Sequence, residues 1–534
     1  MQTAKKTLYK AKKIVTMDKE YPCAEAMLIN NGVIEALGTI QELTEYTQNC
    51  KVDIVDVQDK IIYPGFIETH SHIDYYAVNI PRVFCGLKYK NIGEVLEALK
   101  ERAKQTEEGE WIVGYSYDDT GLAEQRHLTK DDLDKVSTKH PILVFHISGH
   151  VGYINSYAIK KLNLLPTTTV EGGVFVKNEQ GDLNGILEET ALFTNMYDLP
   201  EPDFDTYCQL LQQAMQTYNK CGITTCFIGG IGIASDPEKT MKALLHLERK
   251  NKLTARAYLQ FVPDVMKDLI KYSLFHCGSD FIKFGGLKWV IDGSIQCMTA
   301  ALTKGYHTKP EHKSQLFYTV EEIEKRIEEY HLKDIQIAVH TNGDYASEVA
   351  ITAFEKAYQK HPVKLNHMLI HAQNVSEEHL DRMKAIGIIP SFYGYHIHVW
   401  GDRHANIFLG KERTCHMDPA GSAARRDMPF SLHMDTPILP MTVLDSMQTA
   451  VTRESSTGQV YGEDQKITPY QALQAYTTYA AKCAFWDHAI GMLKVDFKAD
   501  FVVLDHDLET IEPHTIKNTR VCMTVCNGKV VYKA

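Results

Sequence analysis

Two histidines one residue apart close an apolar run near the start of the chain, residues 61–72, IIYPGFIETHSH. On a strand, residues i and i+2 point to the same side, so His70 and His72 can bind one metal ion. Further apolar runs also end in possible ligands, which are Lys288, His340, His371 and Asp435. Imidazole and carboxylate suit zinc or a similar divalent ion, which lowers the pKa of a bound water to about 7. The pattern therefore indicates a metal centre that activates water.

Each of these residues has an ordinary structural explanation when it is taken alone. A His-x-His pair arises easily in a chain with 24 histidines, and a second pair, His396 and His398, is present. Lys288 alone is explained as an ion-paired lysine, and Asp435 before a Thr-Pro pair as a turn residue. The metal interpretation depends on the whole set, because each member ends a predicted strand.

The elements that must position these residues alternate between strand-like and helix-like patterns. The predicted strands are residues 61–70, 222–230, 255–262, 281–290, 334–341, 367–372, 387–394 and 429–435. Helical patterns, such as Val320 to Glu329 and Ser347 to Gln359, lie between most of them. This alternation predicts an α/β fold, a distorted (β/α)8 TIM-like barrel, whose strands converge at their carboxyl ends.

The gap after the first predicted strand is too long for one crossover, so an inserted subdomain is expected near residues 80–205. This insertion carries its own predicted strand, Pro141 to Ile147. The barrel with its insertion is predicted to occupy residues 61–489.

The two ends of the chain resemble each other. Residues 24–38 and 519–533 each read as a hairpin around an Asn-Gly pair, which is a strong type I′ turn signal. Residues 499–505 supply another strand. Because chain termini often meet, residues 1–60 and 490–534 are predicted to form one small β-sandwich.

Length, charge and cysteine usage limit the possible classes of protein. A chain of 534 residues exceeds one compact core, which is consistent with a barrel and additions. The formal net charge of −11, without a basic stripe, argues against nucleic-acid binding. No apolar run reaches the roughly 18 residues of a membrane helix, and Met1 to Lys13 lacks a signal-peptide core. The 12 cysteines include no C-x-x-C pair, so reduced thiols in a cytoplasmic protein are expected.

Longer motifs extend the pattern over nearly the whole chain. They are residues 64–72 (PGFIETHSH), 149–155 (GHVGYIN), 339–346 (VHTNGDYA), 370–373 (IHAQ) and 433–437 (HMDTP). With these motifs the chain resembles the amidohydrolase superfamily, in the family 3 branch that contains the N-substituted formamide deformylases. Family members usually carry Ser-Asp-Ala-Pro where this chain has residues 434–437, MDTP. They carry Gly-Asp-Arg-Ala where it has residues 343–346, GDYA.

The resemblance implies a barrel with a β-sandwich from both chain ends and one or two divalent metals, usually zinc. It implies that His70, His72 and Asp435 bind the first metal. His340 and His371 would bind the second. Lys288 corresponds to a bridging lysine that many relatives carry as a carbamate on Nζ (carboxylysine). An ammonium ion would be repelled between two dications, whereas a carbamate supplies two anionic oxygens.

The resulting function is metal-dependent hydrolysis of a C–N bond in a small molecule: an amide, an N-substituted formamide or a cyclic amide. Asp435 would take a proton from water and pass it to the leaving nitrogen. Lys288 and His371 are the further predicted catalytic residues. The candidate substrate-binding residues are His150, Asn155, Asp292, His396, Trp400 and Arg453. Ordinary polar hydrogen bonding is the alternative for several of them. We expect a homodimer.

Two alternatives to this function stay open. The same site could serve an ester hydrolase, a lyase or an isomerase, because a fold does not dictate a reaction. The chain could also be a non-catalytic metal-binding relative.

Overall fold

The structure is a computed structural model that describes residues 6–534, apart from residues 148, 150, 172, 197, 198, 200, 234, 272–274 and 276. The chain divides into two compact units. The first combines Met1–Asp74 with Leu211–Ala534, and the second is Tyr75–Leu210. The predicted insertion near residues 80–205 falls within the second unit.

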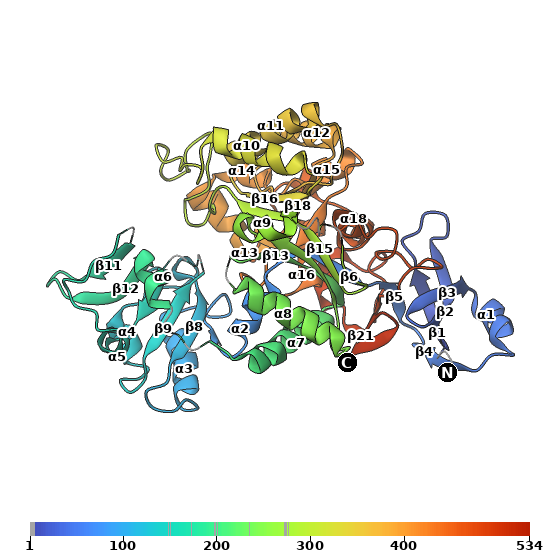
Figure 1. The fold of residues 1–534 in the computed structure, drawn as a ribbon, viewed down its shortest axis with the longest axis horizontal. Coiled ribbons are helices and arrows are strands. Elements are labelled where there is room, and N and C mark those ends of the chain that lie inside the picture. The colour runs from blue at the N-terminus through green and yellow to red at the C-terminus, as the bar shows by residue number, and fades with distance from the viewer. Residues whose placement is uncertain are drawn as a thin grey trace. The chain divides into compact units, whose positions relative to one another are not determined.

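The centre of the first unit is an eight-stranded sheet with parallel neighbours throughout (Figure 1). In sheet order its strands are β6 (Phe66–Ser71), β13 (Ile223–Ile231), β14 (Arg256–Phe261), β15 (Ile282–Val290), β16 (Ile337–Thr341), β17 (Met368–His371), β18 (Ile389–Tyr393) and β19 (Ser431–His433). The Asp435 N–H donates to the His70 carbonyl over 3.1 Å, and the His72 N–H donates to the Thr436 carbonyl over 2.8 Å. These bonds join the two edges, so the sheet is a nearly closed barrel, as predicted.

The barrel strands are apolar runs because both of their faces are covered. Every residue of β13 is buried, and Ile67, Phe227, Ala338 and Met368 belong to one core cluster. Around the strands lie α7 (Phe204–Lys220), α8 (Pro237–Arg249), α9 (Pro263–Lys271), α10 (Val320–His331), α11 (Asp344–Lys360), α12 (Glu377–Ile386), α13 (His396–Arg403), α14 (Lys411–Cys415), α15 (Ala420–Arg425), α16 (Val443–Thr452), α17 (Pro469–Tyr476) and α18 (Thr478–Cys483). The predicted helices at 320–329 and 347–359 are confirmed as α10 and α11.

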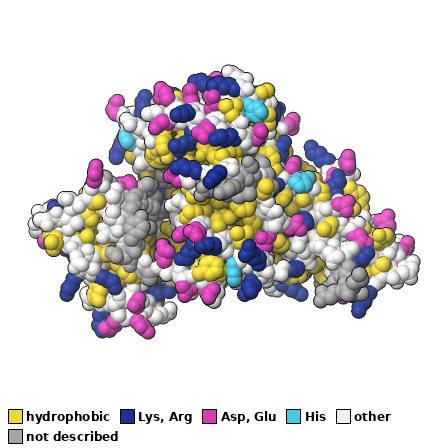
Figure 2. Space-filling view, in the orientation of Figure 1, with side chains coloured by type: hydrophobic (Ala, Val, Ile, Leu, Met, Phe, Trp, Pro, Cys, Tyr) yellow, Lys and Arg dark blue, Asp and Glu magenta, His cyan; other side chains and the backbone are white. Residues whose placement is uncertain are grey.

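Figure 1 shows α10, α11 and α12 side by side over one flank of the barrel. α10 begins with a capping box between Thr319 and Glu322, a sequence signal for a helix start. Charges of both signs are interspersed over this region in Figure 2. Lys356, for example, lies 2.6 Å from Glu324 across the α10–α11 pair. The outer face of these helices is therefore a solvated one.

The two chain ends share a second, eight-stranded sheet. Its strands are β1 (Lys6–Val15), β2 (Cys23–Asn30), β3 (Val33–Gly38), β4 (Val52–Asp56), β5 (Ile61–Pro64), β20 (Phe501–Leu504), β21 (Val521–Cys526) and β22 (Lys529–Lys533), with α1 (Ile40–Thr47) beside them. Both predicted hairpins are confirmed, and their turns have positive φ at Asn31 (51°), Gly32 (81°), Asn527 (51°) and Gly528 (72°). The arrangement of this terminal sheet as a β-sandwich stays a prediction.

The predicted strand at 61–70 is wrong as a single element. β5 pairs antiparallel with β20 in the terminal sheet, and β6 belongs to the barrel. Gly65 separates them, where its N–H donates to the Asp500 carbonyl over 2.9 Å. A Cβ at Gly65 would lie 2.3 Å from Oγ1 of Thr224, so the close approach requires glycine at this break.

The second unit contains a six-stranded sheet in the order β11-β12-β10-β9-β8-β7. Its elements are β7 (Val83–Phe84), β8 (Ile112–Tyr117), β9 (Ile142–His146), β10 (Val151–Ile154), β11 (Gly173–Lys177), β12 (Leu183–Glu189), α3 (Ile92–Ala103), α4 (Lys130–Asp134), α5 (Ser156–Lys161) and α6 (Thr190–Met196), with α2 (Ile73–Asn79) at the junction. The predicted strand at 141–147 is confirmed as β9. Among the helices of the described residues, none is long and apolar enough to span a bilayer.

Candidate metal centre

The carboxyl ends of the barrel strands bring all the predicted ligands together. His70 is the last residue but one of β6, and His72 follows that strand directly. Lys288, His340 and His371 lie on β15, β16 and β17, and Asp435 follows β19. The candidate ligand atoms of His70, His72 and Asp435 all lie within 4.8 Å of one another. Within the part of the chain that the structure describes, this is the cluster whose ligand atoms one cation could contact together.

The distances define a compact site centred on Asp435. Its Oδ1 lies 3.3 Å from Nε2 of His70 and 3.2 Å from Nε2 of His72. Its Oδ2 lies 4.0 Å from Nε2 of His371. On the other side, Nζ of Lys288 is 3.2 Å from Nε2 of His70, and the ring centroids of His340 and His371 are 4.6 Å apart.

Backbone geometry aims these side chains at the site. His371 and Asp435 have φ values of 69° and 54°, in the left-handed region that non-glycine residues seldom adopt. Such backbone concentrates at functional sites, where surrounding contacts hold it. Beside β6, a Cβ at Gly229 would lie 2.3 Å from Nδ1 of His70, so this glycine makes room for the imidazole.

Burial keeps the imidazoles neutral. It lowers the pKa of His70 to about 3 and that of His340 to about 4, and it lowers the pKa of His371 well below the usual range. A neutral imidazole keeps one lone pair, which is the state that binds metals. Burial raises the pKa of Asp435, but the surrounding imidazoles of His70, His72 and His371 outweigh this and hold it well below 3.8.

Two further titratable groups share this interior. Burial lowers the pKa of Lys288 to about 7, although the Asp435 charge opposes the shift. Burial also raises the pKa of Glu68 well above its usual range. The Glu68 carboxyl accepts the backbone N–H of His70 over 3.0 Å and that of Met434 over 3.2 Å, so it fastens β6 to the segment after β19.

The donor set fits a divalent metal. Oδ1 of Asp435 is buried and has no hydrogen-bond partner among the described residues, although two imidazole nitrogens face it. An anionic oxygen and two imidazole nitrogens that converge on one point suit a cation. Two histidines with one carboxylate suit zinc and other first-row divalent ions.

Several predicted substrate-binding residues have their polar atoms occupied by the fold. Asp292 is fully buried and accepts the backbone N–H groups of Ala301, Asn342 and Gly343 over 2.8–3.1 Å, and burial raises its pKa to about 7. It therefore fixes the loops beside His340, whose Nε2 it approaches to 3.8 Å.

Asn155 and Arg453 also bind backbone. Asn155 caps α5, and within the second unit its side chain bonds backbone groups of Ile142 (3.0 Å), Ser137 (2.9 Å) and His140 (3.0 Å). The Arg453 guanidinium donates to the carbonyls of Tyr461 (2.8 Å), Met417 (2.8 Å) and Asp418 (3.3 Å). In this structure both side chains support the fold instead of offering donors to a substrate. His150 lies outside the described residues.

His396 and Trp400 do lie beside the centre. The His396 ring is 6.4 Å from that of His371 and 5.4 Å from that of Trp400, measured between centroids. Nδ1 of His396 lies 3.3 Å from Oδ2 of Asp418, a buried carboxylate that the sequence did not single out. Because they lie beside His371, His396 and Trp400 remain candidates for contact with a substrate.

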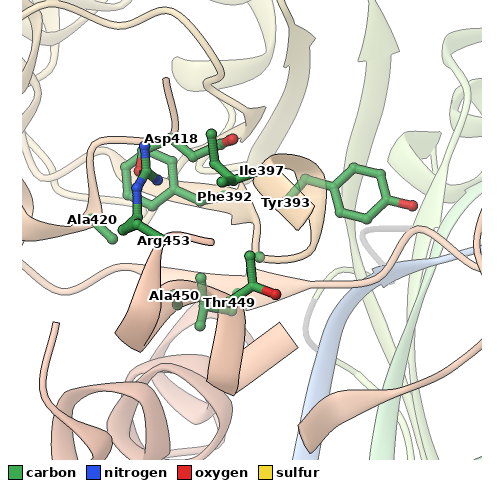
Figure 3. A pocket seen from close by; sticks show the side chains of 10 residues that line it. Phe392, Tyr393, Ile397, Asp418, Ala420, Thr449, Ala450 and Arg453 are labelled. Carbon is green, nitrogen blue, oxygen red and sulfur yellow. The ribbon is translucent and has the colours of Figure 1, made fainter. Parts of the chain in front are cut away.

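A small cavity lies next to Asp418 and Arg453 (Figure 3). Phe392 and Leu432 also line it. The volume open to the centre of a water molecule is only about 10 Å³, which is room for about one water molecule. In Figure 3 the Tyr393 ring points away from Arg453. The cavity is too small for a substrate and belongs to the packing behind β18.

Sequence reasoning missed His433, which approaches His371 to 3.1 Å between Nε2 and Nδ1. It also missed Glu68 and Asp418. The available signal for His433 was its place at the start of the motif that also carries Asp435, residues 433–437 (HMDTP).

Comparisons with known proteins agree with this geometry. The sequence profile described as "Amidohydrolase family" matches residues 53–532. The Bacillus subtilis (strain 168) protein named amidohydrolase YtcJ is 27% identical, over 97% of this chain and 98% of that protein. The N-substituted formamide deformylase of Arthrobacter pascens is 24% identical, over 97% and 96%.

Among solved structures, an uncharacterized metal-dependent hydrolase from Pyrococcus horikoshii OT3 has the same fold. Its TM-score is 0.78 at 23% identity, over 95% of this chain and 99% of that one. With a family match that spans nearly its whole length, the chain belongs to the amidohydrolase family.

Proposed function

We propose that the chain is a metal-dependent hydrolase that cleaves a C–N bond in a small-molecule amide, N-substituted formamide or cyclic amide. The observation that carries this proposal is the convergence of His70, His72 and Asp435 within 4.8 Å at the mouth of the barrel. The similarity to an N-substituted formamide deformylase supports the choice of bond.

The metal, which we expect to be zinc, would supply an activated water and polarise the carbonyl group of the substrate. His70 and His72 would hold it with Asp435, and His340 and His371 offer lone pairs for a second ion. Asp435 is ionised at neutral pH, because its pKa is low, and so can take a proton from water. The same carboxyl would then return that proton to the leaving nitrogen.

Lys288 is proposed to carry a carbamate. A primary amine attacks CO₂ only when it is uncharged, and burial lowers the pKa of Lys288 to about 7. Its nitrogen would form a bond to the carbon of CO₂ and release one proton. The anionic group would then be attached to an Nζ that lies 3.2 Å from Nε2 of His70. Intact-mass measurement under non-acidic conditions would detect the added CO₂.

The proposal is tested with a panel of N-substituted formamides, cyclic amides and the matching esters, assayed with the zinc-loaded and the manganese-loaded protein. We expect hydrolysis of at least one C–N substrate, and loss of it after chelation. Turnover of the esters alone would redirect the assignment to an ester hydrolase on the same site. A protein that turns over none of them and binds no metal would refute the proposal.

A further inference from the structure

A second histidine lies behind the candidate ligand His371. Nε2 of His433 is 3.1 Å from Nδ1 of His371, and Nδ1 of His433 is 2.9 Å from Oγ of Ser391. His433 and Ser391 are fully buried. The nitrogen of His371 that points away from Asp435 is therefore held by another side chain in the barrel interior.

The contacts continue across the barrel. Oγ of Ser391 lies 3.1 Å from Oγ1 of Thr69, whose hydroxyl donates to Oγ of Ser431 over 2.9 Å. Thr69 and Ser431 are also fully buried. One polar chain thus links β17, β19, β18 and β6 beneath the candidate metal centre.

The hydrogen bonds that link these side chains can run in one donor-to-acceptor direction that suits metal binding by His371. A neutral imidazole carries one N–H and one lone pair. If Nε2 of His371 presents its lone pair towards Asp435, then Nδ1 carries the hydrogen and donates it to Nε2 of His433. His433 must then donate from Nδ1 to Ser391, Ser391 donates to Thr69, and Thr69 donates to Ser431. The last of these donations is the direction that the structure shows.

The reverse direction is incompatible with a ligand role. It would place a hydrogen on Nε2 of His371, and a protonated ring nitrogen has no lone pair for a metal. It would also require Ser431 to donate to Thr69, which is opposite to the donation that the structure shows.

We propose that His433 is a positioning residue that fixes His371 in the tautomer whose Nε2 lone pair faces the metal. Ser391 and Thr69 fix the tautomer of His433 in turn. This inference rests on the proposed metal centre and deepens it. Partners that orient a metal-binding histidine typically contribute 10–100-fold to metal affinity, and we expect an effect of about this size.

The test measures metal affinity, independently of any substrate. Metal-depleted protein is titrated with Zn²⁺ against a competing chelator, for the parent and for three variants. His433→Leu removes the acceptor, whereas His433→Gln restores an amide oxygen for His371 and an N–H for Ser391. His367→Leu is the matched control, because His367 forms another buried His–His pair, 2.9 Å from His331, just before β17.

We expect His433→Leu to bind Zn²⁺ about 10–100-fold more weakly, His433→Gln to recover most of that loss, and His367→Leu to bind like the parent even if it unfolds more easily. The visible spectrum of the Co²⁺-loaded protein should change in His433→Leu and return towards the parent spectrum in His433→Gln. A role in folding alone would produce neither the rescue nor the spectral change.

Parent-like affinity in His433→Leu, an equal loss in His433→Gln, or an equal loss in His367→Leu would overturn the inference while leaving the metal centre intact. A parent protein that binds no Zn²⁺ would overturn the proposed function and this inference together. If His433→Leu does not fold, Ser391→Ala replaces it. Ser391→Ala leaves the His433 N–H without its acceptor. We expect this variant to bind Zn²⁺ several-fold more weakly than the parent does. An unchanged affinity would overturn the inference.

Discussion

The backbone N–H of Asp435 donates to the carbonyl oxygen of His70 over 3.1 Å, and the carboxylate of Asp435 lies 3.3 Å from Nε2 of the same histidine. One pair of residues therefore joins the edges of the barrel and also forms the centre of the candidate metal site. Binding of a cation at this pair should reinforce the closure of the barrel.

Metal removal should accordingly destabilise the fold. A ligand that binds only the folded state adds about 2.7 kcal/mol when it is present at about 100 times its dissociation constant. We expect the unfolding temperature to fall after treatment with a chelator and to return when Zn²⁺ is added, as measured by calorimetry. The same unfolding temperature with and without metal would show that the site and the barrel seam are not coupled.

Gly229→Ala should damage the centre without touching a ligand. The added methyl group would meet Nδ1 of His70 at 2.3 Å, so the imidazole must move. We expect metal content and activity to fall while circular dichroism stays close to that of the parent. Gly93→Ala in α3 is the control, because its methyl group meets only the end of the Asn91 side chain. Equal metal content in both variants would contradict the predicted crowding of His70.

Lys288 should give the metal-free protein a characteristic pH dependence. Its pKa is about 7 when folded against 10.5 as an ordinary lysine, so between these values the unfolded chain binds a proton that the folded chain does not. Stability should therefore rise with pH across this window, and Lys288→Met should remove that part of the slope. Urea unfolding at about pH 7 and about pH 9 measures both slopes. Identical slopes would mean that Lys288 is charged in the folded state.

Asp435→Asn should separate metal binding from proton transfer. Asparagine tolerates the left-handed backbone at this position and keeps one ligand oxygen, but it cannot accept the proton. We expect metal to be largely retained while turnover of any amide substrate found falls by roughly 10²–10⁴.

Asp402→Asn is the matched control for that change, because Asp402 accepts hydrogen bonds from Ser455 (3.0 Å), Thr457 (3.0 Å) and Tyr461 (2.9 Å) instead. It should keep the parent rate. A parent rate in Asp435→Asn with metal bound would assign proton transfer to another group.

Much of this fold could be predicted from the sequence, because buried parallel strands are apolar runs and Asn-Gly pairs specify tight hairpins. The convergence of His70 with Asp435 was predictable for the same reason, since parallel strands end at one mouth. The break at Gly65 was not, because the run of residues 61–67 is apolar on both sides of the glycine and only the partner strands show that it serves two sheets.

The roles of individual polar residues were harder to predict. Arg453 and Asn155 look like candidates for substrate contact, yet both bind backbone carbonyls whose positions depend on the folded loops. His433 lies in a strand of only three residues, too short for periodicity to indicate which way its side chain points.

The central claim is tested most directly by elemental analysis of the purified protein and of the double variant His70→Ala with His72→Ala. Both histidines approach the same Asp435 oxygen, so their loss should remove the ion that this oxygen binds. We predict about one to two divalent ions per chain in the parent, and loss of most of that metal in a double variant that remains folded by circular dichroism. A parent protein without metal, or a double variant with full metal content and activity, would contradict the account.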